Sequence, residues 1–347
     1  MARRRATSSW VKAFNRNLRA MARAARQLPR APRVARAKAA RGVANGPGDW
    51  LPGLALGPGG ARRYRLYRPP DLPAHGRVPL LVMLHGCGQD SAGFAASTRM
   101  NALARREGFL VLYPEQDRLA HPQRCWNWYD TRSGRAQAEA SLILAAIDQI
   151  VLLHAADPAR IALAGLSAGA GMAALLATRE PTRFRAVVMH SGVAPGVAES
   201  TATALAAMRG RRLPAPGEAP ADPAAERWPP LLVIQGGSDA VVSPRNGAAV
   251  ARLWAAQLGA TAGAPRELRR GQRHPMTVTD FKQRGHALVS LVEVPRLGHA
   301  WSGGTASQPY SDARGPDASR MAWAFVSRQF RRIPGTETPT KPATLDR

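Results

Sequence analysis

The sequence contains little cysteine, no long apolar run and no acidic residue among its first 48 positions. Two cysteines, Cys87 and Cys125, are too few for a disulfide-rich scaffold, and composition leaves open whether they pair or stay free. No stretch of 18 or more apolar residues is present, so the sequence predicts no transmembrane helix. Three arginines at positions 3–5 are not followed by an apolar segment, which argues against a secretory signal.

The net charge of +26 is concentrated at the start of the chain. Residues 1–48 hold thirteen Lys or Arg and no Asp or Glu, which leaves a moderately basic remainder. Residues 1–41 are predicted to form a basic arm, and apolar residues spaced by three and four between Trp10 and Leu28 favour an amphipathic helix within it. Such a helix suits an anionic membrane or granule surface, and a solvated basic arm is the open alternative.

The remainder of the chain alternates between strand-like and helix-like segments. Residues 42–61 are rich in Gly and Pro and predict a linker, residues 62–333 a catalytic domain, and residues 334–347 a flexible tail. Alternating segments predict a mainly parallel sheet with helices on both faces. The predicted strands are 64–67, 80–84, 109–113, 160–164, 186–190, 231–235 and 287–294, and the predicted helices are 92–106, 138–154, 168–179, 244–258 and 318–330.

Two stretches interrupt this alternation. Residues 198–229 are rich in Ala, Pro and Arg and predict a loop or lid element, whereas residues 261–286 are basic and polar and predict a hairpin or an excursion near the site.

One pentapeptide carries the strongest chemical signal. Gly165-Leu166-Ser167-Ala168-Gly169 follows a predicted strand and begins a predicted helix of small residues. The order strand, G-x-S-x-G, helix is the nucleophile elbow of α/β-hydrolases, in which a tight turn exposes the serine above the sheet. The sequence therefore predicts an α/β-hydrolase fold with Ser167 as nucleophile.

A serine hydroxyl needs a base, and the base needs an orienting carboxylate. In α/β-hydrolases these partners follow the serine in the order acid, then histidine. Asp239 comes directly after the strand 231–235, and His299 comes after the last predicted strand. Of the eight histidines, His299 alone fits both the chain order and the strand-end position, so Asp239 and His299 are predicted to complete a triad.

The oxyanion hole needs two backbone N–H groups. Ala168, directly after the nucleophile, is predicted to supply one, and the amide of Cys87, in the loop after an early strand, the other. Trp126, Trp128 and Trp301 lie near strand ends and either shape a substrate groove or pack in the core. This chemistry needs no metal and no organic cofactor.

Several motifs, the elbow among them, are informative in combination. They are the segments 84–90, 98–101, 113–116, 125–128, 165–169, 238–244, 299–304 and 312–319. Together they resemble the polyhydroxybutyrate (PHB) depolymerase family of esterases, which is related to feruloyl and acetylxylan esterases. The resemblance covers about residues 62–332. It implies a serine carboxylesterase with Ser167, Asp239 and His299 as triad, and it makes a Cys87–Cys125 disulfide plausible.

We therefore expect hydrolysis of short-chain hydroxyalkanoate esters or oligomers. A feruloyl or acetylxylan type of esterase is the alternative, and nucleic-acid binding through the basic arm is a remote one, since no nucleic-acid module is recognisable and no nucleic-acid partner is expected. The absence of a recognisable signal favours a cytoplasmic, granule-associated location. The resemblance to exported enzymes keeps an extracellular location as the alternative.

Overall fold

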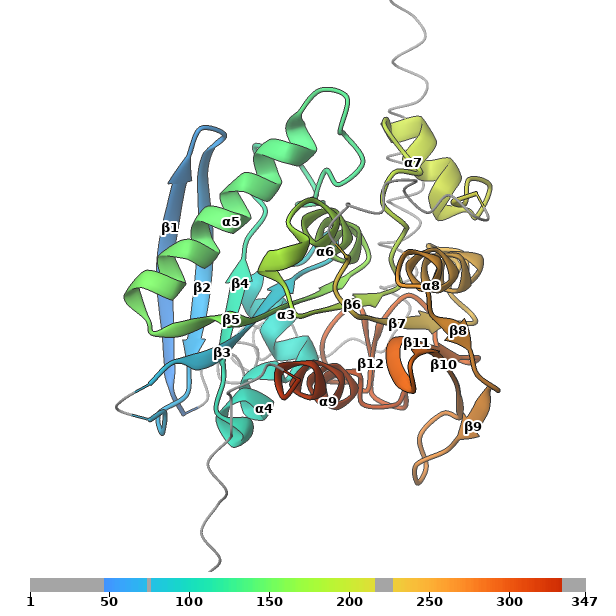
Figure 1. The fold of residues 1–347 in the computed structure, drawn as a ribbon. Coiled ribbons are helices and arrows are strands. Elements are labelled where there is room, and N and C mark those ends of the chain that lie inside the picture. Colours follow the sequence, from blue (N-terminus) through green and yellow to red (C-terminus); the bar gives the residue numbers. More distant parts are fainter. Residues whose placement is uncertain (1–46, 74–75, 216–226, 333–347) are drawn as a thin grey trace, which may run out of the picture.

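The computed structural model describes residues 47–73, 76–215 and 227–332 (Figure 1). These residues form an eleven-stranded sheet in the order β1-β2-β4-β3-β5-β6-β7-β11-β10-β8, with β9 beside β10. A small second sheet pairs β12 (Trp301–Ser302) with β13 (Ser311–Asp312). The strands of the large sheet are β1 (Asp49–Gly57), β2 (Gly60–Arg68), β3 (Val78–Leu84), β4 (Leu110–Pro114), β5 (Ala156–Leu166), β6 (Ala186–His190), β7 (Leu231–Gly236), β8 (Thr261–Ala262), β9 (Arg266–Leu268), β10 (Met276–Gln283) and β11 (His286–Val294).

The centre of the sheet is parallel, as the alternation of segments predicts. Strands β4, β3, β5, β6, β7 and β11 pair in parallel, and antiparallel strands flank them at both edges. Because parallel strands are covered on both faces, they consist of almost continuous apolar residues. Every residue of β4 and β6 is buried.

Helices cover both faces of this sheet (Figure 1). One face carries α5 (Arg135–Leu153), α6 (Ala168–Arg179) and α8 (Arg245–Gln257), and the other carries α3 (Ser91–Thr98), α4 (Met100–Glu107) and α9 (Ala318–Phe330). Successive residues of a strand point to opposite faces. Leu80 and Val82 accordingly join the core beneath α5 and α6, whereas Leu81 and Met83 join the core beneath α9.

Among the described helices, α5 alone is long and apolar enough to cross a membrane. It packs instead along β1, β2 and β5, and its buried residues include Glu139. Packing against the sheet accounts for the apolar face of α5.

The prediction of a linker at 42–61 is wrong for residues 49–57. Residues Asp49–Gly57 form β1, which pairs antiparallel with β2 along its whole length, so the sheet begins before residue 62. Glycine in this strand reflects close packing, because a Cβ built on Gly53 would lie 2.0 Å from the ring of Tyr64. The predicted arm 1–41 and the tail 334–347 lie outside the described residues.

The predicted helix 92–106 is also wrong as a single element. It is split into α3 and α4 at Arg99, which has a φ of +55° in the left-handed region. Within the interrupting stretches, residues 198–229 contain α7 (Thr201–Met208), and residues 261–286 supply β8, β9 and β10 to the sheet.

Candidate active site

Ser167 occupies the turn between β5 and α6 in a strained conformation. Its φ and ψ of 57° and −119° lie in a region that a residue with a side chain rarely adopts. The surrounding backbone holds it there: the N–H of Ser167 donates to the carbonyl of His190 at 2.9 Å, and its own carbonyl accepts from Gly171 N at 3.1 Å. Backbone strain of this kind persists only where neighbouring structure imposes it, and it concentrates at functional sites.

The two glycines of the pentapeptide have no room for a side chain. A Cβ built on Gly165 would lie 2.3 Å from the carbonyl oxygen of Gly169, and one built on Gly169 would lie 2.1 Å from that of Leu84. The turn therefore packs directly against its own helix and against the end of β3. The small residues that define the motif are required by these close approaches.

Asp239 and His299 meet at the same edge of the sheet as Ser167. Asp239 follows β7, His299 follows β11, and Nδ1 of His299 lies 2.8 Å from Oδ2 of Asp239. The other carboxylate oxygen, Oδ1, accepts from the N–H groups of Val241 and Val242 at 2.9 and 2.8 Å. With Nδ1 donating to the carboxylate, the imidazole presents Nε2 as the atom able to accept a proton.

The environment of Asp239 keeps it ionised. Burial raises the pKa of its carboxyl group, but the charge and hydrogen bond of His299 and the two backbone N–H donors outweigh that effect, so its pKa lies below the usual value. An ionised, fixed carboxylate is what an orienting partner of a catalytic histidine requires.

Among the described residues no hydrogen bond joins Ser167 Oγ to His299, so their roles as nucleophile and base stay predictions. Both interact with His190: its carbonyl accepts from the N–H of Ser167, and the charges of His299 and Asp239 shift the pKa of its ring. Catalytic hydrogen bonds are commonly long without substrate and shorten when it binds.

His190 is a structural histidine. Its Nε2 accepts from the N–H of Ser302 at 3.1 Å, and its ring stacks on Trp301 at a centroid distance of 5.2 Å. Burial, reinforced by the nearby charge of His299, lowers the pKa of His190 to about 3. It therefore stays neutral near pH 7, and because its Nδ1 lies 3.2 Å from the hydroxyl of Ser191, neither ring nitrogen is free to serve Ser167.

This buried histidine predicts a measurable loss of stability in acid. Its folded pKa of about 3 lies below the unfolded value of 6.5, so between these values the unfolded state binds a proton that the folded state lacks. Its contribution to stability is complete above pH 6.5 and declines as the pH falls, by about 1.4 kcal/mol per pH unit. Urea titrations at pH 7, 6, 5 and 4 should show a flatter pH dependence for His190→Gln than for the parent.

His286→Gln supplies the matched control, because it makes the same substitution at an exposed position. Equal slopes for parent and His190→Gln would show that His190 is protonated in the folded state.

The loop after β3 brings backbone N–H groups next to the nucleophile. A Cβ built on Gly86 would lie only 3.6 Å from Cβ of Ser167. His85 donates from Nδ1 to the carbonyl of Gly86 at 2.8 Å, and its Nε2 accepts from the N–H of Gln116 at 3.1 Å. In a trans peptide the carbonyl of Gly86 and the N–H of Cys87 point in opposite directions, so His85 fixes the orientation of the predicted oxyanion donor. Ala168, the first residue of α6, has an N–H without an intrahelical partner.

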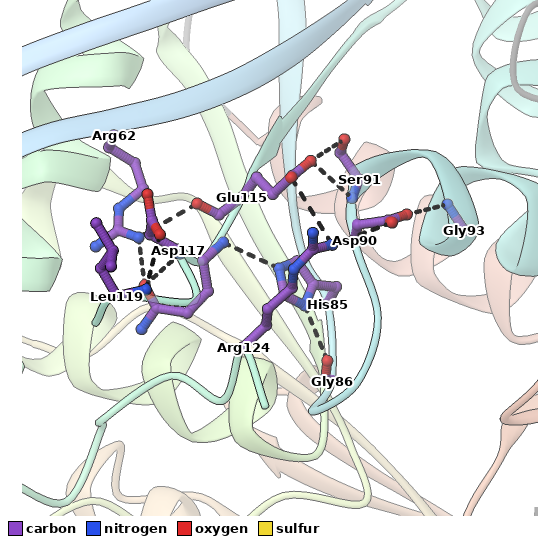
Figure 2. A network of polar contacts seen from close by, with 11 residues as sticks. Arg62, His85, Gly86, Asp90, Ser91, Gly93, Glu115, Asp117, Leu119 and Arg124 are labelled. Carbon is purple, nitrogen blue, oxygen red and sulfur yellow. Dashed lines mark hydrogen bonds and ion pairs between the residues drawn. The ribbon is translucent and has the colours of Figure 1, made fainter. Parts of the chain in front are cut away.

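Figure 2 shows several polar contacts around this loop. Asp90 caps α3 by accepting from Gly93 N at 2.8 Å, and Arg124 lies 3.1 Å from the other oxygen of Asp90. Glu115 accepts from the hydroxyl of Ser91 at 2.6 Å. A disulfide joins Cys87 to Cys125, as the family resemblance implies, and ties the loop to the segment that carries the tryptophans.

A buried polar network behind this segment was not predicted from the sequence. Glu139 of α5 accepts from Nε2 of Gln116 at 2.7 Å and from both the backbone and side chain of Asn127, at 2.9 and 2.6 Å. Gln116 also donates to the carbonyl of Cys125 at 3.0 Å. Glu139, a carboxylate within an otherwise apolar helix, could have indicated this network, because such a group is buried only when it is hydrogen-bonded.

Two of the three predicted substrate-binding tryptophans line a cavity next to Ser167. The cavity has a volume of about 40 Å³ and is almost entirely apolar, and α7 forms one wall of it. Its lining includes Trp126, Trp128, Cys87, Cys125, Tyr129, Ser167, Ala168, Val193, Ala204, Met208 and Val242.

Of the two interpretations of Trp301, substrate binding is wrong and packing in the core is what the structure shows. Trp301 is completely buried in the core beneath α9, packs edge-on against Phe94, and donates from Nε1 to Ser319 at 3.1 Å. Its ring stacks on the ring of His190. Within 47–73, 76–215 and 227–332, no cluster of three or more His, Cys, Asp or Glu could hold a metal ion.

The parallel sheet, the strained elbow and the strand-end Asp–His pair define an α/β-hydrolase. The acetyl xylan esterase from Aspergillus awamori has a similar fold, with a TM-score of 0.59 at 19% identity, over 73% of this chain and 94% of that one. Among sequence relatives, poly(3-hydroxyalkanoate) depolymerase C of Paucimonas lemoignei is 32% identical over 205 residues, which cover 54% of this chain and 46% of that protein. Feruloyl esterase B of Thermothelomyces thermophilus is 29% identical over 141 residues, covering 40% and 47%.

The family model described as esterase PHB depolymerase matches residues 62–264, more than half of the chain. The chain belongs to this family. It spans about half the length, or less, of the first curated relatives that it matches.

Proposed function

We propose that the protein is a serine carboxylesterase that hydrolyses short-chain hydroxyalkanoate esters or oligomers through an acyl-enzyme. The observation that carries this proposal is the apolar cavity of about 40 Å³ with Ser167 in its wall. Family membership and the depolymerase relative support an ester of a hydroxy acid as substrate.

In the proposed reaction Ser167 Oγ attacks the ester carbonyl while Nε2 of His299 takes its proton. The developing oxyanion is stabilised by the N–H groups of Ala168 and Cys87, and His299 returns the proton to the leaving alcohol. Water then attacks the acyl-enzyme by the same route in reverse. Asp239 orients His299 throughout and stabilises its cationic form.

The alternative is an esterase for acetyl or feruloyl groups on carbohydrate, and it draws on the feruloyl esterase relative and the acetyl xylan esterase fold. A cavity of this size favours an acetyl or butyryl group over the aromatic feruloyl group, unless α7 moves. Attachment of residues 1–41 to an anionic granule or membrane surface, and a cytoplasmic location, remain proposals that rest on the sequence.

The cavity predicts a preference for short acyl chains. We expect kcat/KM for 4-nitrophenyl acetate and butyrate to exceed that for the octanoate by at least roughly tenfold, since misfit of even one methylene costs about 1–3 kcal/mol. Met208→Ala should enlarge the cavity at α7 and raise the octanoate-to-butyrate ratio. Met321→Ala is the matched control, because Met321 is a residue of α9 and packs against the core on the other face of the sheet.

Trimers of 3-hydroxybutyrate and methyl ferulate complete the substrate panel. Cleavage of the trimer with methyl ferulate untouched supports the proposal, and the reverse result supports the alternative. Equal rates on butyrate and octanoate in the parent would remove the cavity as the basis of the assignment.

A further inference from the structure

A second and larger cavity lies on the opposite face of the sheet from Ser167. It has a volume of about 830 Å³ and is bounded by α9 and by β9, β10 and β11. Leu232, Met276, Val278, Val292 and Phe325 form its floor and belong to the core beneath α9. The lining of the Ser167 cavity belongs largely to the other core, beneath α5, α6 and α8. The two cavities have no lining residue in common.

Arginine dominates the charged lining of this cavity. Its two carboxylates, Asp280 and Asp317, face six guanidinium groups from the segment before β10, from β9, from α9 and from the turn between α3 and α4. The six are Arg99, Arg266, Arg270, Arg273, Arg320 and Arg328.

The two carboxylates are already engaged. Asp280 binds Arg266 at 2.5 Å and also accepts from the hydroxyl of Ser290 at 2.6 Å. Asp317 is shared between Arg320 at 3.7 Å and Arg99 at 3.9 Å.

Three guanidinium groups of the lining make no ion pair, although the charge of Asp280 acts on one of them, Arg328, from a greater distance. In the described part of the chain no carboxylate lies within 4 Å of Arg270, Arg273 or Arg328. The same cavity therefore combines an excess of positive charge with an apolar floor.

Two of the arginines are held in place before any ligand arrives. Arg99 donates to the carbonyl of Gly303 at 2.7 Å, and Arg273 donates to that of Gly315 at 2.6 Å. A donor fixed in this way loses little conformational entropy when it binds an anion. Each keeps further N–H groups for a ligand, because a guanidinium carries five.

A buried histidine also belongs to the lining. His274 is only 8% exposed, and its Nε2 lies 3.6 Å from Oδ2 of Asp312, closer than either arginine lies to Asp317. The groups that can bind an anion in this cavity are therefore its arginines.

We propose that this cavity binds an amphiphilic organic anion, an alkyl chain that ends in a carboxylate or a phosphate. Guanidinium groups pair with both headgroups in bidentate geometry, and the apolar floor would accept the chain. The volume lies in the range of small-ligand sites. The proposal does not depend on the identity of the ester that reacts at Ser167.

Isothermal titration calorimetry on the full chain tests this with octanoate and octyl phosphate. Acetate and inorganic phosphate supply the headgroup alone, and 1-octanol supplies the chain alone. We expect each octyl anion to bind at least tenfold more tightly than its headgroup and than 1-octanol. Whichever octyl anion binds more tightly identifies the headgroup, carboxylate or phosphate, that the site prefers.

Variants locate the binding. Arg270→Gln should weaken binding by roughly tenfold, and the double variant Arg270→Gln/Arg328→Gln by roughly a hundredfold, because each removes a charge-assisted hydrogen bond. Arg179→Gln, at the exposed end of α6, is the matched control for lost charge and should bind like the parent. Arg270 is exposed on a connecting segment, so its single variant keeps the test valid even if the double variant fails to fold.

Two results would overturn the proposal. One is binding of 1-octanol as tight as that of the octyl anions, which would make the site merely apolar. The other is an affinity unchanged by Arg270→Gln, which would place the anion elsewhere, including in the Ser167 cavity. Neither result bears on esterase activity, which is measured separately with 4-nitrophenyl butyrate.

Discussion

Ser167→Ala is expected to lower kcat for 4-nitrophenyl butyrate by roughly 10⁴- to 10⁶-fold while leaving the fold intact. The hydroxyl supplies the bond-forming atom, so its loss removes the acyl-enzyme route and not merely a contact that orients the ester. Ser167 is the residue at which the strained turn, the apolar cavity and the loop after β3 converge. Any residual rate should reflect the oxyanion donors and substrate binding alone.

The control for this variant is Ser141→Ala, which removes an exposed hydroxyl from α5. It should keep the parent's kcat, and both variants should unfold cooperatively at temperatures close to the parent's. A second readout is labelling by an organophosphate, which should modify one serine in the parent and none in Ser167→Ala. A Ser167→Ala protein as active as the parent would falsify the triad.

The candidate site could be predicted from the sequence because its chemistry is tied to local order along the chain. Ser167 follows β5, Asp239 follows β7 and His299 follows β11, and the carboxyl ends of parallel strands share one edge of a sheet. The Asp239–His299 hydrogen bond confirms that their side chains meet there. The position of Ser167 Oγ against Nε2 depends on side-chain and loop geometry, which strand order does not determine.

Other features depend on contacts between distant segments, and the local sequence does not report these. Composition suggested a linker at β1, yet Gly53 is needed there because the ring of Tyr64 lies over it. Arg99 breaks a helix without a glycine or proline nearby, and its side chain is held by Gly303, more than two hundred residues away. Trp301 follows the candidate histidine as a groove residue would, but the chain turns it into the core.

The close packing around the small residues of the elbow can be tested by substitution. Gly169→Ala is expected to destabilise the fold by about 3 kcal/mol or more, because overpacking of this severity cannot be relieved by a side-chain rotation. The new Cβ would lie 2.1 Å from the carbonyl of Leu84 and 2.6 Å from that of His85, both of which are backbone atoms. Relief therefore requires α6 to move away from β3, and this would separate Ser167 from the oxyanion loop.

The urea midpoint of unfolding and the rate of ester hydrolysis should therefore both be lower in Gly169→Ala than in the parent. We expect kcat to fall by roughly 10²-fold or more, because one oxyanion donor is displaced. Gly298→Ala is the matched control for stability, since a Cβ built there has no neighbour within 4 Å and its backbone is not left-handed. It should unfold at the parent's urea midpoint. Gly169→Ala could instead match the parent in both measurements. In that case the close approach of the elbow to β3 does not hold Ser167 beside the amide of Cys87. The oxyanion hole would then be formed by another pair of N–H donors.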